Sequence, residues 1–224
     1  MLSSFVLLYN HVQVLISLKV EFAVQIKNKG CLEELKKVLK GSGIVEIDEN
    51  EGRVVINTTR PWIEVQKAIE DTGRKAVLTG FSDQAAVASL DGEKVKGVIR
   101  FCSIVSNKPG IVVDGVVDGL DTNKEYKLNI CEFGDIRSGC DNLGDVYKNS
   151  SYKINSDDTG RSTFRTVDQN LHVWELIGRS VAITEPIGTR LTCGVICRAA
   201  AIFQNYKKIC ACDGTTIWNE KTER

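Results

Sequence analysis

Histidine is almost absent from this chain of 224 residues, which contains only His11 and His172. With two imidazoles, a Ser-His-Asp catalytic arrangement is not expected, and a metal centre held mainly by histidines cannot form. A glycine-rich phosphate loop of the Walker type is also missing from the sequence. These absences argue against several common classes of enzyme, and we expect no catalytic residues.

The chain also lacks an excess of charge of either sign. Lys plus Arg and Asp plus Glu both number 29, so the formal net charge is zero. Nucleic-acid-binding proteins usually carry a basic excess, so no nucleic-acid partner is expected.

No uninterrupted apolar run is long enough to span a membrane, because Asn10, His11 and Gln13 break up the apolar start of the chain. A signal peptide would need a basic start and a small-residue cleavage site, and neither is clear. We therefore interpret residues 1–18 as an N-terminal extension of uncertain role and expect a cytoplasmic protein with no membrane partner.

Residues 19–80 show alternating strand and helix patterns. "KVEFAVQI" alternates like a strand, and "CLEELKKVLKG" has apolar residues at helical spacing before a glycine. Two short strands around an Asn-Glu-Gly turn follow, and then Pro61 opens a second helix before a last strand, "RKAVLTG". This βαββαβ order predicts a ferredoxin-like domain.

The remainder of the chain has a different period. Residues 81–94, "FSDQAAVASLDGEK", are small and polar, which indicates a linker. Residues 95–202 contain short β-rich runs separated by turn signals, typical of an all-β sandwich or barrel. Residues 203–224 lose periodicity and are expected to form a short irregular tail. The fold class is thus α+β followed by all-β.

The tail holds Cys210 and Cys212, one residue apart. Cu(I) is a soft ion that prefers thiolates, so two cysteines can bind it without histidine. In an extended segment the two side chains point the same way, with Cα atoms about 6.6 Å apart. Lys207 and Lys208 lie nearby and would favour the thiolate form. The alternative is that these are two reduced cysteines without a role.

Several segments together resemble the copper chaperones for superoxide dismutase. They are "EFAVQ", "GRKAVLTGF", "VDGVVDGL", "FGD", "VWELIGRSV", "RLTCGVICRAA" and "CACDGTTIW". The resemblance covers roughly residues 19–220. It implies a metallochaperone-like first domain (residues 19–80), a Greek-key β-domain (95–202) similar to copper/zinc superoxide dismutase, and a Cys-x-Cys tail. The tail would deliver Cu(I) to the enzyme and support formation of its disulfide.

The resemblance also implies an intradomain disulfide between Cys140 and Cys193. Bridging them would close a loop of about 50 residues, which the chain-entropy model values at roughly 4 kcal/mol before any strain. A reducing cytosol opposes such bridges, so two buried thiols are the alternative.

Cys31 is the remaining candidate copper ligand. The family's first domain often carries Met-x-Cys-x-x-Cys, whereas this chain reads "IKNKGC", with Asn28 in place of the first cysteine. One thiol beside an amide is a poor Cu(I) site, so the first domain is not expected to acquire copper in the usual way. The alternative is a cysteine at a helix N-terminus with a lowered pKa and no metal.

The β-domain departs further from the enzyme it resembles. The positions that match family copper ligands are Asn129, Cys131 and Thr184. The segment 141–158, where zinc ligands are expected, contains no histidine, and Ser150 falls where the zinc aspartate would be. Arg190 matches the arginine next to the enzyme's copper. The zinc site is therefore expected to be lost, and superoxide dismutase activity is not expected.

The other cysteines and histidines are expected to be structural. Cys102, Cys131 and Cys197 are interpreted as core or interface residues. Cys197 lies in a segment whose equivalent strand end forms the dimer interface in the family, and its apolar residues, Val195, Ile196 and 199–202, suit a surface that mates with a similar domain. An ordinary core strand is the alternative. His172 is expected to lie on a strand, sharing a face with Trp174.

Two functions remain open. The first is a copper chaperone that docks on a superoxide dismutase subunit as a heterodimer, carrying Cu(I) transiently on its tail; a homodimer through the β-domain is also possible. The second is a docking and thiol-redox partner of the same enzyme that no longer binds copper.

Overall fold

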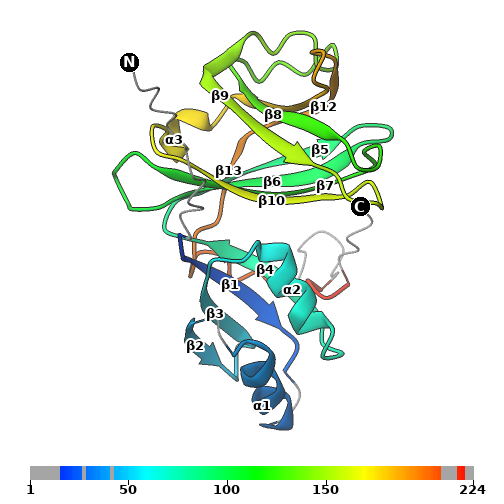
Figure 1. Ribbon diagram of the computed structural model, residues 1–224. Coiled ribbons are helices and arrows are strands. Elements are labelled where there is room, and N and C mark those ends of the chain that lie inside the picture. Colours follow the sequence, from blue (N-terminus) through cyan, green and yellow to red (C-terminus); the bar gives the residue numbers. More distant parts are fainter. Residues whose placement is uncertain (1–15, 27–28, 41–42, 208–215, 220–224) are drawn as a thin grey trace, which may run out of the picture.

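The computed structural model describes residues 16–26, 29–40, 43–207 and 216–219 (Figure 1). Most of the N-terminal extension, together with Cys210 and Cys212, lies outside these described residues. The described chain forms two β-rich units that lie against each other, the smaller one below the larger in the view of Figure 1.

The first unit is a four-stranded antiparallel sheet with two helices. Its elements are β1 (Leu18–Val24), α1 (Lys29–Val38), β2 (Gly43–Asp48), β3 (Arg53–Thr58), α2 (Trp62–Glu70) and β4 (Ala76–Phe81). The strand order is β2-β3-β1-β4. Alternate residues of β1, Val20, Phe22 and Val24, join a buried cluster with Leu35 of α1 and Val65 of α2, so both helices cover one face of the sheet.

The second unit is a two-sheet β-structure with one short helix. Its elements are β5 (Ala85–Asp91), β6 (Lys96–Ser103), β7 (Ile111–Asp118), β8 (Glu125–Cys131), β9 (Val146–Asn155), β10 (Ser162–Asp168), α3 (Val173–Leu176), β11 (Ser180–Thr184), β12 (Arg190–Val195) and β13 (Cys197–Ala199). The sheets run β10-β7-β6-β5-β13 and β12-β11-β8-β9. Their facing side chains form a separate core that includes Ile99, Phe101, Leu128 and Val181.

Two expectations from the sequence need correction here. Residues 81–94 are not a linker, because Ala85–Asp91 form the strand β5. Every residue of β5 pairs with a residue of β6. His172 is not on a strand; it precedes the short helix α3, whose Glu175 side chain accepts a hydrogen bond from the His172 backbone N–H. None of the helices that the described residues form could cross a membrane.

The two units share a buried junction. Trp62, at the start of α2, belongs to the same apolar cluster as Cys102, Val112 and Val116 of the second unit. Polar contacts cross the junction as well: Arg165 of β10 donates to the carbonyl oxygens of Thr58 and Arg60, at 3.1 and 2.7 Å. The buried apolar side chains and these hydrogen bonds together hold the first unit against the β10-β7-β6-β5-β13 sheet of the second.

Candidate functional site

Cys31, the candidate ligand of the first unit, is the third residue of α1 and is half-buried. The Arg74 guanidinium pairs with Glu34 at 2.6 Å, and the neighbouring Cys31 and Glu34 side chains raise the pKa of Arg74. Asn28, which stands where the family has its other cysteine, lies outside the described residues. A cation therefore lies beside the Cys31 thiol.

In the second unit, a side-chain hydrogen bond fills the positions that match copper ligands. Asn129 of β8 and Thr184 of β11 lie on paired strands, and the Asn129 amide donates to the Thr184 hydroxyl at 3.1 Å. Cys131 is 1% exposed, and burial raises the pKa of its thiol. A neutral amide, a hydroxyl and a buried protonated thiol are poor ligands for a redox-active copper ion.

Segment 141–158, where the resemblance places the family's zinc ligands, contains no histidine. Ser150 of β9 is 2% exposed and sits on a strand facing the protein interior. Within the described part of the chain, no three His, Cys, Asp or Glu side chains gather into a group that could hold a metal ion.

Cys140 and Cys193 are joined by a disulfide, with Cα atoms 5.9 Å apart. The bridge ties the loop after β8 to β12. Arg190, at the start of β12, donates to the carbonyl oxygens of Cys140 and Gly144, at 2.7 and 2.6 Å. The arginine that would lie beside copper in the enzyme thus holds the disulfide loop in place.

An exposed apolar patch lies at one end of the β-unit. We define the Phe133 patch as Phe133, Ile177 and Cys197; the first two side chains are 57% and 43% exposed, and Cys197 is exposed. A Cβ on Gly134 would clash with the Gly178 carbonyl, so glycine lets the two loops approach closely. The loops that carry Phe133 and Ile177 are therefore close neighbours.

Hydrogen bonds to backbone carbonyls hold these segments together. The Ser180 hydroxyl donates to the Phe133 carbonyl at 2.6 Å, and the Gly178 N–H donates to the Ile196 carbonyl at 2.9 Å. Ile196 itself is fully buried. Of the expected interface residues 199–202, Ala199 pairs with Ala85 of β5, and residues 200–202 run beside the end of β4, where the Phe81 N–H donates to the Ala200 carbonyl.

The tail touches the first unit on both sides of its undescribed segment. Phe203 donates its backbone N–H to the Glu21 carboxylate at 2.6 Å, and Lys75 donates to the Trp218 carbonyl at 2.8 Å. Cys210 and Cys212 fall between these two contacts in sequence but lie outside the described residues. Sequence reasoning missed Glu21, because its partner is 182 residues away in the chain.

No protein-family model matches the chain. Curated relatives do. The mouse protein "Copper chaperone for superoxide dismutase" is 36% identical over 90% of this chain and 88% of its own length. The human protein of that name is 35% identical with the same coverage, and a Debaryomyces hansenii protein named "Superoxide dismutase 1 copper chaperone" is 28% identical over 92% of this chain.

A solved structure of the clock protein EA4 aligns with 50% of this chain at 23% identity and a TM-score of 0.44. The alignments with the four mammalian relatives at 34–36% identity each cover 90% of this chain and 88% of the relative. The chain therefore belongs to the family of copper chaperones for superoxide dismutase.

Proposed function

We propose that this chain docks on copper/zinc superoxide dismutase and transfers Cu(I) to it through Cys210 and Cys212. The observation that carries the proposal is the Asn129–Thr184 hydrogen bond, at 3.1 Å, in the positions that match copper ligands. A β-unit built this way keeps a surface for binding but offers no redox metal centre. Thiolates are then the chain's suitable ligands for Cu(I), and transfer is a stepwise exchange of thiolate ligands for those of the enzyme.

The proposed docking surface is the Phe133 patch. Exposed apolar side chains that are presented together commonly mark protein interfaces, and this patch is presented by three fixed segments. We propose that it receives the matching end of a superoxide dismutase subunit to form a heterodimer, and that a homodimer forms through the same patch when no enzyme is present. The ferredoxin-like first unit then accompanies the docked β-unit, and the cytoplasm is the proposed site of the reaction.

Thiol exchange alone is the second candidate. The cysteine content of the first unit favours it, because residues 19–80 contain one cysteine, Cys31, and so offer no pair of thiols that could take up copper. In this version a Cys210–Cys212 disulfide is reduced to two thiols while two thiols of the enzyme are oxidised to a disulfide, through a mixed disulfide. Copper would reach the enzyme by another route.

Activation of reduced, metal-depleted superoxide dismutase tests both candidates. Two forms of the chain, loaded with Cu(I) or copper-free and oxidised to the Cys210–Cys212 disulfide, are each mixed with the enzyme. The Cys210→Ser, Cys212→Ser variant, treated in the same two ways, is the comparison, and the enzyme's dismutase activity, bound copper and disulfide are followed. Activation by the intact chain alone supports copper transfer. If the oxidised chain forms the enzyme's disulfide while the Cu(I)-loaded chain delivers no copper, thiol exchange is the function. Equal effects of the intact chain and the variant would contradict both candidates.

Docking is tested separately with Ile177→Asp. A charge in the middle of the apolar patch should weaken binding to reduced superoxide dismutase by about tenfold or more, measured by sedimentation or calorimetry. Ile187→Asp is the matched control, since Ile187 is 86% exposed in the loop between β11 and β12, beyond the far end of β11. Equal binding by the two variants would place the docking surface elsewhere.

A further inference from the structure

The first unit buries a carboxylate on the sheet face that its helices do not cover. Val20, Phe22 and Val24 of β1 point into the helix-covered core, so Lys19, Glu21 and Ala23 point the other way. Lys19 is exposed, as expected for an open face, yet Glu21 is only 2% and Ala23 only 7% exposed. Something therefore covers the open face at Glu21 and not at Lys19.

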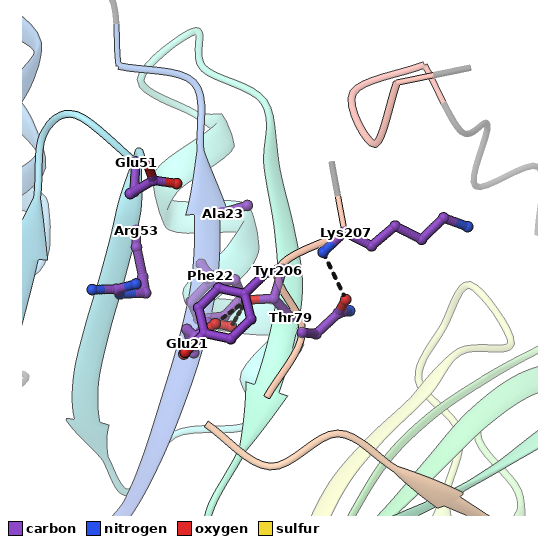
Figure 2. Close-up of a pocket in the computed structure, with 9 residues that line it drawn as sticks. Glu21, Phe22, Ala23, Glu51, Arg53, Thr79, Tyr206 and Lys207 are labelled. Atoms are coloured by element: carbon purple, nitrogen blue, oxygen red, sulfur yellow. Dashed lines mark hydrogen bonds between the residues drawn. The ribbon is translucent and has the colours of Figure 1, made fainter. Parts of the chain in front are cut away.

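The C-terminal tail is that cover. Residues 200–203 run beside the end of β4: the Phe81 N–H donates to the Ala200 carbonyl at 3.3 Å, and the Ile202 N–H donates to the Ser82 carbonyl at 3.0 Å. Figure 2 shows the Tyr206 ring over the strand that carries Glu21, and Tyr206 lines the same small pocket as Glu21.

Glu21 receives two hydrogen bonds in this arrangement. Its Oε2 accepts the Phe203 backbone N–H at 2.6 Å, and its Oε1 accepts the Thr79 hydroxyl at 2.8 Å. The Arg53 guanidinium lies 5.3 Å from the centre of the Phe203 ring, in cation–π range. A buried carboxylate without partners is costly, so these donors explain why the tail stays over Glu21.

Gly80 provides the close approach. A Cβ at this position would lie 2.7 Å from both the Ala201 carbonyl oxygen and the Ile202 Cα, closer than real side chains come. Only glycine lets the tail backbone lie so near β4. Downstream of the undescribed segment, Ile217 is 8% exposed, and Lys75 donates to the Trp218 carbonyl, which holds the tail to the first unit a second time.

We propose that the open face of the first sheet is a docking surface for the chain's own tail, with Glu21 as its anchor and Gly80 as its point of closest approach. The first unit then positions the tail, whether or not it acquires copper. Cys210 and Cys212 lie in sequence between the Phe203 and Trp218 contacts, so the docked tail is held at both sides of the Cys-x-Cys segment. The effect on transfer rests on the proposed function; the docking itself does not.

Amide hydrogen exchange of the full chain, followed by NMR, tests the docking. The Ile202 and Phe203 amides should be protected in the unmodified protein and should exchange about tenfold faster or more in Glu21→Ala and in Gly80→Ala. The β1–β3 ladder amides report that the first unit stays folded, and Glu33→Ala, on an exposed position of α1, is the control. Unprotected amides in the unmodified protein, or protection that survives in both variants, would overturn the docking.

The activation assay then separates docking from function. Gly80→Ala keeps both tail thiols, so a changed rate of superoxide dismutase activation supports a positioning role for the first unit. An unchanged rate, with the amides deprotected, would refute that positioning role. Full activation by the Cys210→Ser, Cys212→Ser variant would refute the proposed function instead. The hydrogen-exchange evidence for docking of the tail would not be affected.

Discussion

Asp114 is a fully buried carboxylate of β7 at the junction between the two units. Burial raises its pKa to about 7, and Arg165, the Trp62 backbone N–H and Arg100 offset this only in part. Arg165 approaches Asp114 at 3.2 Å, but its Nη2 makes no aligned hydrogen bond, and Asp114 Oδ1 has no hydrogen-bond partner. The weak pairing explains why desolvation dominates.

The sign of the pH dependence follows from this raised pKa. Between about pH 4 and pH 7 the native state binds a proton at Asp114 that the unfolded state has lost, so the contribution of this group to stability falls as pH rises. The expected slope is up to about 1.4 kcal/mol per pH unit. Denaturant unfolding across this range should show the slope in the unmodified protein and a flatter profile in Asp114→Asn. Parallel profiles would contradict the assignment.

Thr184 supplies a second prediction for a single residue. Thr184→Val keeps the shape of the side chain but removes the acceptor for the Asn129 amide, which leaves a buried donor unsatisfied. The free energy of unfolding should fall by about 1–3 kcal/mol. Thr163→Val, at an exposed position of β10, is the matched control and should change it by less than about 0.5 kcal/mol. Equal losses in the two variants would mean that the hydrogen bond is unimportant.

From the sequence, Asn129 and Thr184 could be recognised as non-histidine residues at positions that match copper ligands. The hydrogen bond that joins them could not be predicted, because it depends on the pairing of β8 with β11. Glu21 shows the same limit more strongly. Its place in the alternating pattern of β1 suggests a solvent-facing residue, and only a tail from the far end of the chain buries it. Contacts distant in sequence leave no local signal.

At the scale of elements, the Cys140–Cys193 bridge joins the loop after β8 to β12. Cys193→Ser should lower the free energy of unfolding under oxidising conditions, by up to roughly 4 kcal/mol in the chain-entropy model. Under reducing conditions the difference between variant and unmodified protein should shrink, since both then lack the cross-link. Thermal unfolding with and without a thiol reductant measures this, and an equal melting temperature under oxidising conditions would contradict it.

Element order was more readable from the sequence than element boundaries. The helices at α1 and α2 have regular apolar spacing, and Pro61 marks the start of the second. β5 was missed because Ala85, Ala86 and Ala88 are small residues that look like linker composition. In the structure these three are buried, where their size suits close packing inside the unit. Small residues alone do not distinguish a linker from a tightly packed strand.

At the scale of the whole molecule, the shared cluster around Trp62 should make the two units unfold together. Trp62 is 6% exposed, and the Arg100 guanidinium of the second unit lies 4.9 Å from its ring. Trp62→Ala should cost about 3–5 kcal/mol and split one calorimetric transition into two. Trp174→Ala is the control, since Trp174 is 66% exposed. Two transitions in the unmodified protein would show that the junction does not couple the units.

The most direct test of the central claim is an anaerobic Cu(I) titration of the reduced full chain and of its Cys210→Ser, Cys212→Ser variant. The proposed chaperone mechanism predicts one tightly bound equivalent that is lost in the variant. Tight binding that survives in the variant would contradict it and move the copper site to Cys31 or another cysteine. Absence of tight binding in both proteins would also contradict it, leaving thiol exchange as the function of the tail.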